Sequence, residues 1–153
     1  MQDTAFDHSS AGFWLGALLL WLVLSIAYRR TSGKPLVASV RAGAVFTERW
    51  ASARIGSGLI ARLGTARNCM HVQVADSKLH LHPHFPFTLG FMPELYGLDL
   101  VVPLERISSA TILGGNHAKA VEVAFRTPGG EQETAQLLLR NPESFVRAAL
   151  SRP

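Results

Sequence analysis

One apolar run dominates the hydropathy pattern of this chain. Residues 11–28 (AGFWLGALLLWLVLSIAY) contain no charged side chain, and two arginines follow at once. Eighteen residues at the rise of an α-helix extend over about 27 Å, close to the ~30 Å hydrocarbon core of a bilayer. We therefore predict one N-terminal transmembrane helix over residues 11–28, preceded by a short extracytoplasmic tail over residues 1–10.

The charges that flank this helix predict its orientation. Residues 1–10 hold Asp3 and Asp7 but no Lys or Arg, whereas residues 29–34 hold three basic residues. Because basic residues close to a span are retained in the cytoplasm, we expect a single-pass protein of the inner (plasma) membrane. Its N-terminus is then outside and its C-terminal domain cytoplasmic. A cleaved secretory signal is the alternative, but such a signal begins with basic residues.

After the helix, the pattern changes to short alternating segments separated by turn residues, which is typical of an antiparallel sheet. Residues 29–45 are expected to form a basic juxtamembrane linker, and the stretch up to Trp50 fits either a short helix or a first strand. Where the alternation is clearest, Leu79 and Leu81 should face the core and the neighbouring histidines should face outward. Seven strands are predicted, over residues 57–63, 68–75, 79–82, 99–104, 109–113, 119–126 and 131–139.

A helix is predicted at the end of the chain. Asn141 can accept hydrogen bonds from the free backbone amides of a first turn, Pro142 suits that turn, and Glu143 favours the positive end of the helix dipole. The apolar face of this helix is expected to consist of Phe145, Val146, Ala149 and Leu150.

The predicted order of elements is one span, about seven antiparallel strands and one amphipathic C-terminal helix. This order resembles the pleckstrin-homology-like (PH-like) domains of bacterial membrane-anchored proteins. The stretches that carry the resemblance are residues 68–81 (NCMHVQVADSKLHL), 85–87 (FPF), 102–107 (VPLERI) and 141–150. It implies a mainly β domain over residues 46–153, built as a PH-like barrel capped by a helix. It also implies a non-catalytic binding or scaffolding module that contacts a protein partner.

The formal net charge of +4 is concentrated near the predicted membrane. Residues 29–67 hold eight basic residues and one acidic residue, whereas residues 68–153 hold seven basic and eight acidic ones. Arg54, Arg62 and Arg67 are therefore candidates for contact with anionic lipid headgroups. The alternative is that the basic residues only follow the positive-inside rule. Nucleic-acid binding is not expected, because aromatic residues are not interleaved with this charge.

Alternating histidines at positions 80, 82 and 84 are the clearest hint of metal chemistry. On a strand, His80 and His82 project from the same face and could share a zinc ion, with His84 or a cross-strand His71 as the third ligand. A metal-binding protein or enzyme is therefore the alternative to the binding module, which needs no cofactor. A milder interpretation is a patch that gains charge near pH ~6.5.

The connection over residues 85–98 is unusually apolar for a loop. Phe87, Phe91 and Tyr96 are candidates for an interaction surface that meets the bilayer or a partner helix, since exposed apolar patches mark such sites. The alternative is that these side chains cap one end of the barrel.

Two further features concern association and reactivity. Gly12 and Gly16 form a small-xxx-small pair that could bring two copies of the span together as a homodimer. Cys69 lies among apolar residues, where a buried, inert thiol is the expected state. The chain has no GxGxxG, GxxxxGK[ST], GxSxG, HExxH or CxxC motif, so the common nucleotide, hydrolase, metalloprotease and redox signatures are missing.

Overall fold

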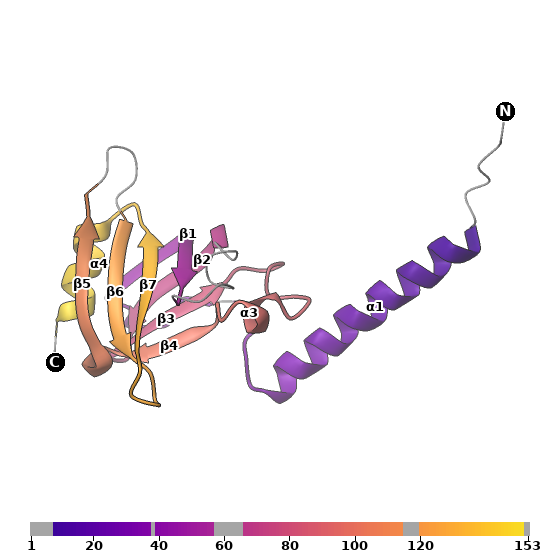
Figure 1. Ribbon diagram of the computed structural model, residues 1–153, viewed down its shortest axis with the longest axis horizontal. Coiled ribbons are helices and arrows are strands. Elements are labelled where there is room, and N and C mark those ends of the chain that lie inside the picture. Colours follow the sequence, from indigo (N-terminus) through magenta and orange to yellow (C-terminus); the bar gives the residue numbers. More distant parts are fainter. Residues whose placement is uncertain (1–7, 38, 57–65, 115–119, 152–153) are drawn as a thin grey trace.

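The computed structural model describes residues 8–37, 39–56, 66–114 and 120–151. A long helix, α1 (His8–Thr31), projects from a β domain that carries the C-terminal helix α4 (Pro142–Leu150) (Figure 1). The N-terminal apolar helix is confirmed, and it extends the predicted range 11–28 by three residues at each end. Its segment Ala11–Thr31 is long and apolar enough to cross a membrane.

An antiparallel sheet forms the β domain, as predicted. The described strands follow the order β4-β3-β2-β1-β7-β6-β5. Their bounds are β1 (Phe46–Ile55), β2 (Ala66–Ala75), β3 (Lys78–Pro83), β4 (Leu100–Pro103), β5 (Ile107–Leu113), β6 (Ala120–Arg126) and β7 (Gln132–Leu138). Two short helices, α3 (Met92–Leu95) and η1 (Leu104–Arg106), precede β4 and β5 respectively.

Strand β1 connects the two halves of this sheet. It pairs with β2 over residues 46–53 and with β7 over residues 52–55. Its register with β2 shifts on either side of Ala51, and Trp50 has φ +64°, so the strand is bulged and bent there. The bend lets β5–β7 cross β3 and β4 at a steep angle (Figure 1).

The first described strand agrees with one of the two alternatives that the sequence left open. The stretch before Trp50, for which helix and strand were both open, begins β1. The strand predicted over residues 57–63 lies outside the described residues. The other six predicted strands match β2 to β7 within two residues at each end.

A single apolar core joins both halves of the sheet and α4. Leu79 and Leu81 point into it, as predicted. Phe145 of α4 is fully buried and packs edge-on against Phe46 of β1, with ring centroids 5.3 Å apart. The predicted apolar face of α4 is wrong at Leu150, which is 47% exposed, and Ala148 is buried instead. Phe145, Ala148 and Ala149 follow the i, i+3, i+4 spacing of one helix face.

The start of α4 is stabilised by a side chain that sequence reasoning did not identify. Asn141 makes no side-chain capping hydrogen bond. Instead, the carboxylate of the buried Glu48 on β1 accepts hydrogen bonds from the backbone N–H of Arg140, at 2.7 Å, and of Asn141, at 3.3 Å. The predicted Asn side-chain cap is therefore absent, and Glu48 fixes the two residues that lead into α4.

Candidate functional site

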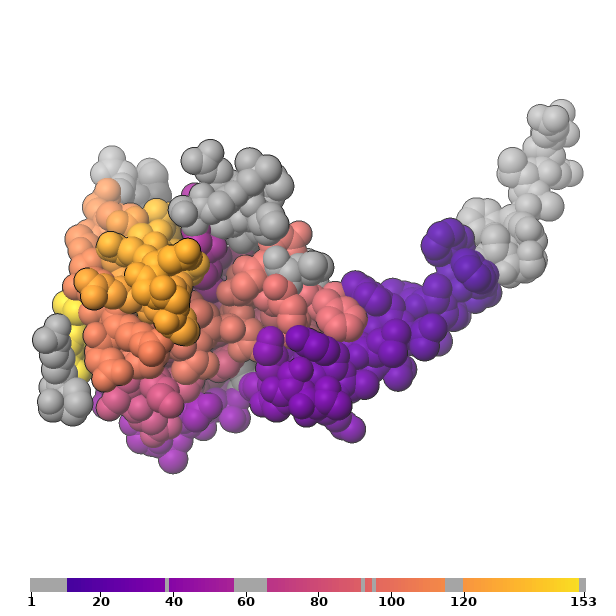
Figure 2. Space-filling view, turned by 60° about the horizontal axis from the view of Figure 1, so that its bottom comes forward, coloured from indigo at the N-terminus to yellow at the C-terminus, as the bar shows by residue number. Residues whose placement is uncertain are grey.

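Helix α1 is buried along one narrow stripe near its C-terminal end. Ser25 is fully buried and Arg29 is 1% exposed, while Leu22 and Ile26 are half-buried. These four positions follow the 3.6-residue period, so they form one helix face. This face contacts the connection between β3 and β4, and we call the contact between α1 and residues 84–99 the junction. Figure 2 shows this connection, in salmon, against the base of α1.

The upper part of the junction joins Ser25 to the connection. The Ser25 hydroxyl oxygen accepts hydrogen bonds from the backbone N–H of Gly90, at 2.9 Å, and of Phe91, at 3.3 Å. The ring of Phe91 packs against Trp21 and Tyr28, with centroids 6.3 and 5.5 Å away. A Cβ atom on Gly90 would lie 2.7 Å from the Trp21 ring, and its φ is +72°, so only glycine fits there.

The lower part of the junction is an ionic network around Arg29. Its guanidinium donates to Glu94 and to Asp99, both at 2.9 Å, and to the Pro35 carbonyl at 2.9 Å. Lys34 also pairs with Glu94, at 3.2 Å. Two carboxylates thus face two cations, so a nearly dry arginine is compensated in charge.

His82 completes this network by a short hydrogen bond from Nδ1 to Asp99 Oδ1. Burial by itself raises the pKa of Asp99. The hydrogen bond from His82 and the charges of His82 and Arg29 outweigh burial, so the pKa of Asp99 lies below its usual value. Asp99 is therefore ionised at neutral pH.

The linker covers the outer face of β2 and β3. Gln73 donates to the Ser39 carbonyl at 3.1 Å and accepts from the Arg41 backbone N–H at 3.3 Å. The same amide contacts His71 Nε2 at 2.9 Å. The histidines do lie on the face opposite the core, as predicted, yet His71 and His80 are only 2% and 3% exposed.

Burial shifts the acid–base behaviour of these histidines. It lowers the pKa of His71 to about 4, helped by the nearby positive charges of His84, Arg49 and His82. The pKa values of His80 and His84 are also lowered, again chiefly by burial. The pKa values of His71, His80 and His84 therefore lie below the value near 6.5 that was expected for this patch.

The three histidines proposed as zinc ligands have separate surroundings. His82 is hydrogen-bonded to Asp99. The His84 ring stacks on the rings of Trp50 and His71, with centroids 4.5 and 5.3 Å away. The centroid of the His80 ring lies 5.9 Å from that of His82. Within the described ranges, no group of three or more His, Cys, Asp or Glu side chains could hold a metal ion. Asp99, the partner of His82, is 17 residues away, so local sequence gave no signal for it.

The aromatic residues proposed as one surface have three different environments. Phe87 is 49% exposed, Phe91 packs on α1, and Tyr96 packs against the core. One part of the connection therefore packs in the core, another packs on α1, and a third is exposed. Phe85, which is 54% exposed, belongs to the exposed part.

The remaining candidates are more dispersed. Arg54 on β1 and Arg67 on β2 are exposed, whereas Arg62 lies outside the described residues. Gly12 and Gly16 have open space where a Cβ would lie. Cys69 is buried, which raises the pKa of its thiol, in agreement with the expected inert state.

Comparison with protein-family models and with curated proteins finds no match to this chain.

Proposed function

We propose that this protein is a membrane-anchored, non-catalytic binding module. In this proposal α1 crosses the inner (plasma) membrane once, with the N-terminus outside. The β domain is a PH-like barrel at the cytoplasmic face, where it contacts a protein partner and anionic lipid headgroups.

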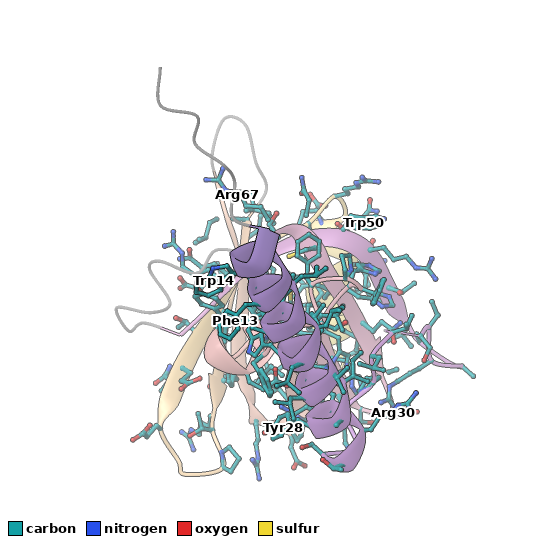
Figure 3. All side chains as sticks on the ribbon, turned by 90° about the vertical axis from the view of Figure 1, so that its right-hand side faces the viewer. Phe13, Trp14, Tyr28, Arg30, Trp50 and Arg67 are labelled. Carbon is teal, nitrogen blue, oxygen red and sulfur yellow. The ribbon has the colours of Figure 1, made fainter. Side chains whose placement is uncertain are left out.

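The observation that carries the proposal is the exposed apolar surface of α1. Phe13, Trp14, Leu15 and Leu20 are each at least 59% exposed. Figure 3, seen from the side on which α1 projects, shows Phe13, Trp14 and Tyr28 extending from the helix. Only 6% of the most apolar window of α1 is buried. An apolar helix with no protein cover is stable in lipid and unfavourable in water.

The strand order and α4 support the PH-like part of the proposal. Two groups of strands share β1, enclose one core, and are followed by a helix that packs on that core. Because fold alone does not give function, the binding role rests on the junction. The side-chain network around Arg29 holds the domain in one orientation on α1, which supports a role in presenting one surface of the domain to a partner at the membrane.

Two measurements on the full chain test this proposal. We expect the protein to resist alkaline extraction from membranes, and a C-terminal reporter to be active only in the cytoplasm. Release by alkali, or an extracytoplasmic C-terminus, would contradict the anchor and its orientation.

The binding surface is tested separately by charge reversal at its exposed arginines. A photo-crosslinker at Leu138, which is exposed and lies two residues from Gln136, the pairing partner of Arg54, should give protein or lipid adducts in native membranes. We expect Arg54→Glu with Arg67→Glu to reduce these adducts several-fold, and Arg126→Glu, exposed at the end of β6, to leave them unchanged. Equal adduct yields in all variants would remove Arg54 and Arg67 from the binding surface.

A further inference from the structure

We infer that the loop over residues 85–91 (FPFTLGF) lies in the cytoplasmic leaflet of the bilayer beside α1, as a second membrane contact. This inference rests on the proposed function, in which α1 spans the membrane. It adds a membrane-inserted loop to an anchor that otherwise consists of one helix.

Contacts with α1 hold the loop at the level of the apolar run. Ser25 belongs to the apolar run and lies four residues before Arg29. At 1.5 Å per residue, Ser25 is about 6 Å and Trp21 about 12 Å further along α1 than Arg29. Gly90 contacts both of these side chains. A loop bonded at the level of Ser25 and Trp21 shares the depth of the helix segment to which it is bonded.

Hydrogen bonds within the protein pair most of the backbone N–H groups of the loop. A loop exposed to lipid must satisfy its polar groups within the protein. The N–H of Phe87 donates to the His84 carbonyl at 2.8 Å, and that of Leu89 donates to the Pro86 carbonyl at 3.0 Å. Pro86 has no N–H, and the Ser25 hydroxyl accepts hydrogen bonds from the N–H groups of Gly90 and Phe91. The Thr88 hydroxyl donates to the Leu36 carbonyl at 2.9 Å. Four of the six backbone N–H groups of this short loop, and the Thr88 hydroxyl, are therefore paired.

The exposed surface of the loop is apolar and aromatic. It contains no charged residue, and its outer surface is formed by Phe85 and Phe87, which are 54% and 49% exposed. Trp50 adjoins the loop, since it stacks on His84 and is 51% exposed. Aromatic rings at this depth are typical of the membrane interface. The same rings in water would be an unfavourable patch.

Depth-dependent quenching in vesicles tests the inference on the full chain. Single cysteines at Phe87, Leu19 and Ile112, in a Cys69→Ala background, are labelled with an environment-sensitive fluorophore and reconstituted into phosphatidylcholine vesicles. Ile112 is the matched apolar control, because it is 37% exposed on β5, at the far side of the domain from α1 (Figure 1). Spin-labelled lipids carry the quencher either near the headgroup or deep in the acyl chain.

We expect the label at position 87 to be quenched several-fold more than the label at position 112, most strongly by the shallow quencher. The label at position 19 should respond most to the deep quencher. Quenching at 19 without quenching at 87 would overturn the inserted loop and leave the span intact, which is the result if a partner protein covers Phe85 and Phe87. Absence of quenching at 19 would overturn the proposed span itself.

A second variant guards against a label that alters the loop. Phe85→Ser with Phe87→Ser should leave the thermal midpoint in detergent nearly unchanged, because both rings are outside the core. The same variant should reduce quenching of a label at Trp50 by the shallow lipid several-fold. Unchanged quenching at position 50 would contradict the insertion of the two rings.

Discussion

His71 shows how a single buried side chain links the sheet to the linker. Gln73 donates to Ser39 and accepts from Arg41, which orients its amide. Its nitrogen can therefore only donate to His71 Nε2. Neutral His71 accepts this hydrogen bond, whereas protonated His71 would place N–H against N–H. Acid thus weakens the contact between linker and sheet.

The stability of the protein should therefore fall between pH 6.5 and about pH 4. The unfolded state binds protons on His71 near its ordinary pKa of 6.5, and the folded state binds them only near 4. Stability from this group is complete above pH 6.5 and is lost as the pH falls through this window, by about 3 kcal/mol. Urea unfolding of the full chain in detergent at several pH values measures this loss.

The variant His71→Gln isolates the contribution of His71. Gln stays neutral and can still accept from Gln73, so we expect a shallower pH dependence than in the unsubstituted protein. His80 and His84 also have lowered pKa values, so some dependence should remain. Parallel curves for the two proteins would show that His71 does not titrate in this window.

At the scale of elements, the Glu48 carboxylate on β1 accepts hydrogen bonds from the backbone N–H groups of the two residues that precede α4. Glu48→Ala leaves two N–H groups without this acceptor, and we expect a loss of about 1–3 kcal/mol in the free energy of unfolding. Asn141→Ala is the control: Asn141 is exposed and makes no capping hydrogen bond, so its loss should be below about 0.5 kcal/mol. If urea unfolding showed a larger loss for Asn141→Ala than for Glu48→Ala, the Asn141 side chain would be the one that stabilises the start of α4.

The contact between Gly90 and Trp21 determines how the loop packs on α1. Gly90→Ala combines a positive φ with a Cβ 2.7 Å from the Trp21 ring, whereas Gly97→Ala has a similar φ, +60°, and open space. Backbone strain costs about 1 kcal/mol in both. We therefore expect the larger loss of thermal stability, and a changed Trp fluorescence, only for Gly90→Ala. Equal effects would mean that the ring moves aside without cost.

On the scale of the whole molecule, the network around Arg29 fixes the β domain on α1. Arg29→Ala leaves Glu94 and Asp99 unpaired in a dry site, which costs about 3–5 kcal/mol for a buried ion pair. Arg30→Ala is the matched control, because Arg30 is the next residue, has the same charge and is exposed. We expect Arg29→Ala to undock the domain and Arg30→Ala to leave it docked.

Distances between spin labels at Leu15 and Ser144 report this docking in reconstituted full chain. In a Cys69→Ala background, the protein and its Arg30→Ala variant should give one narrow distance distribution. Arg29→Ala should give a broad one. A narrow distribution in all three would show that Ser25 and Phe91 hold the junction without the ionic network.

Local sequence patterns are enough to specify α1, strands β2–β7 and α4, because hydrophobic period and turn residues act over a few positions. They leave β1 open between helix and strand, because its alternation is broken by the bulge at Trp50. They also fail at the acceptor for the start of α4, because Glu48 is 92 residues from Arg140.

The junction depends on tertiary structure alone. Because Arg29 directly follows an apolar run, the sequence predicts that its charge is solvated. In the structure it is buried against Glu94 and Asp99, which are 65 and 70 residues away in the chain. In the sequence, Ser25 is only a neutral residue within an apolar helix. The structure shows that its hydroxyl accepts a hydrogen bond from the Gly90 backbone N–H. Periodicity predicts which face of an element is apolar, whereas only the folded chain decides which distant side chains a buried polar group meets.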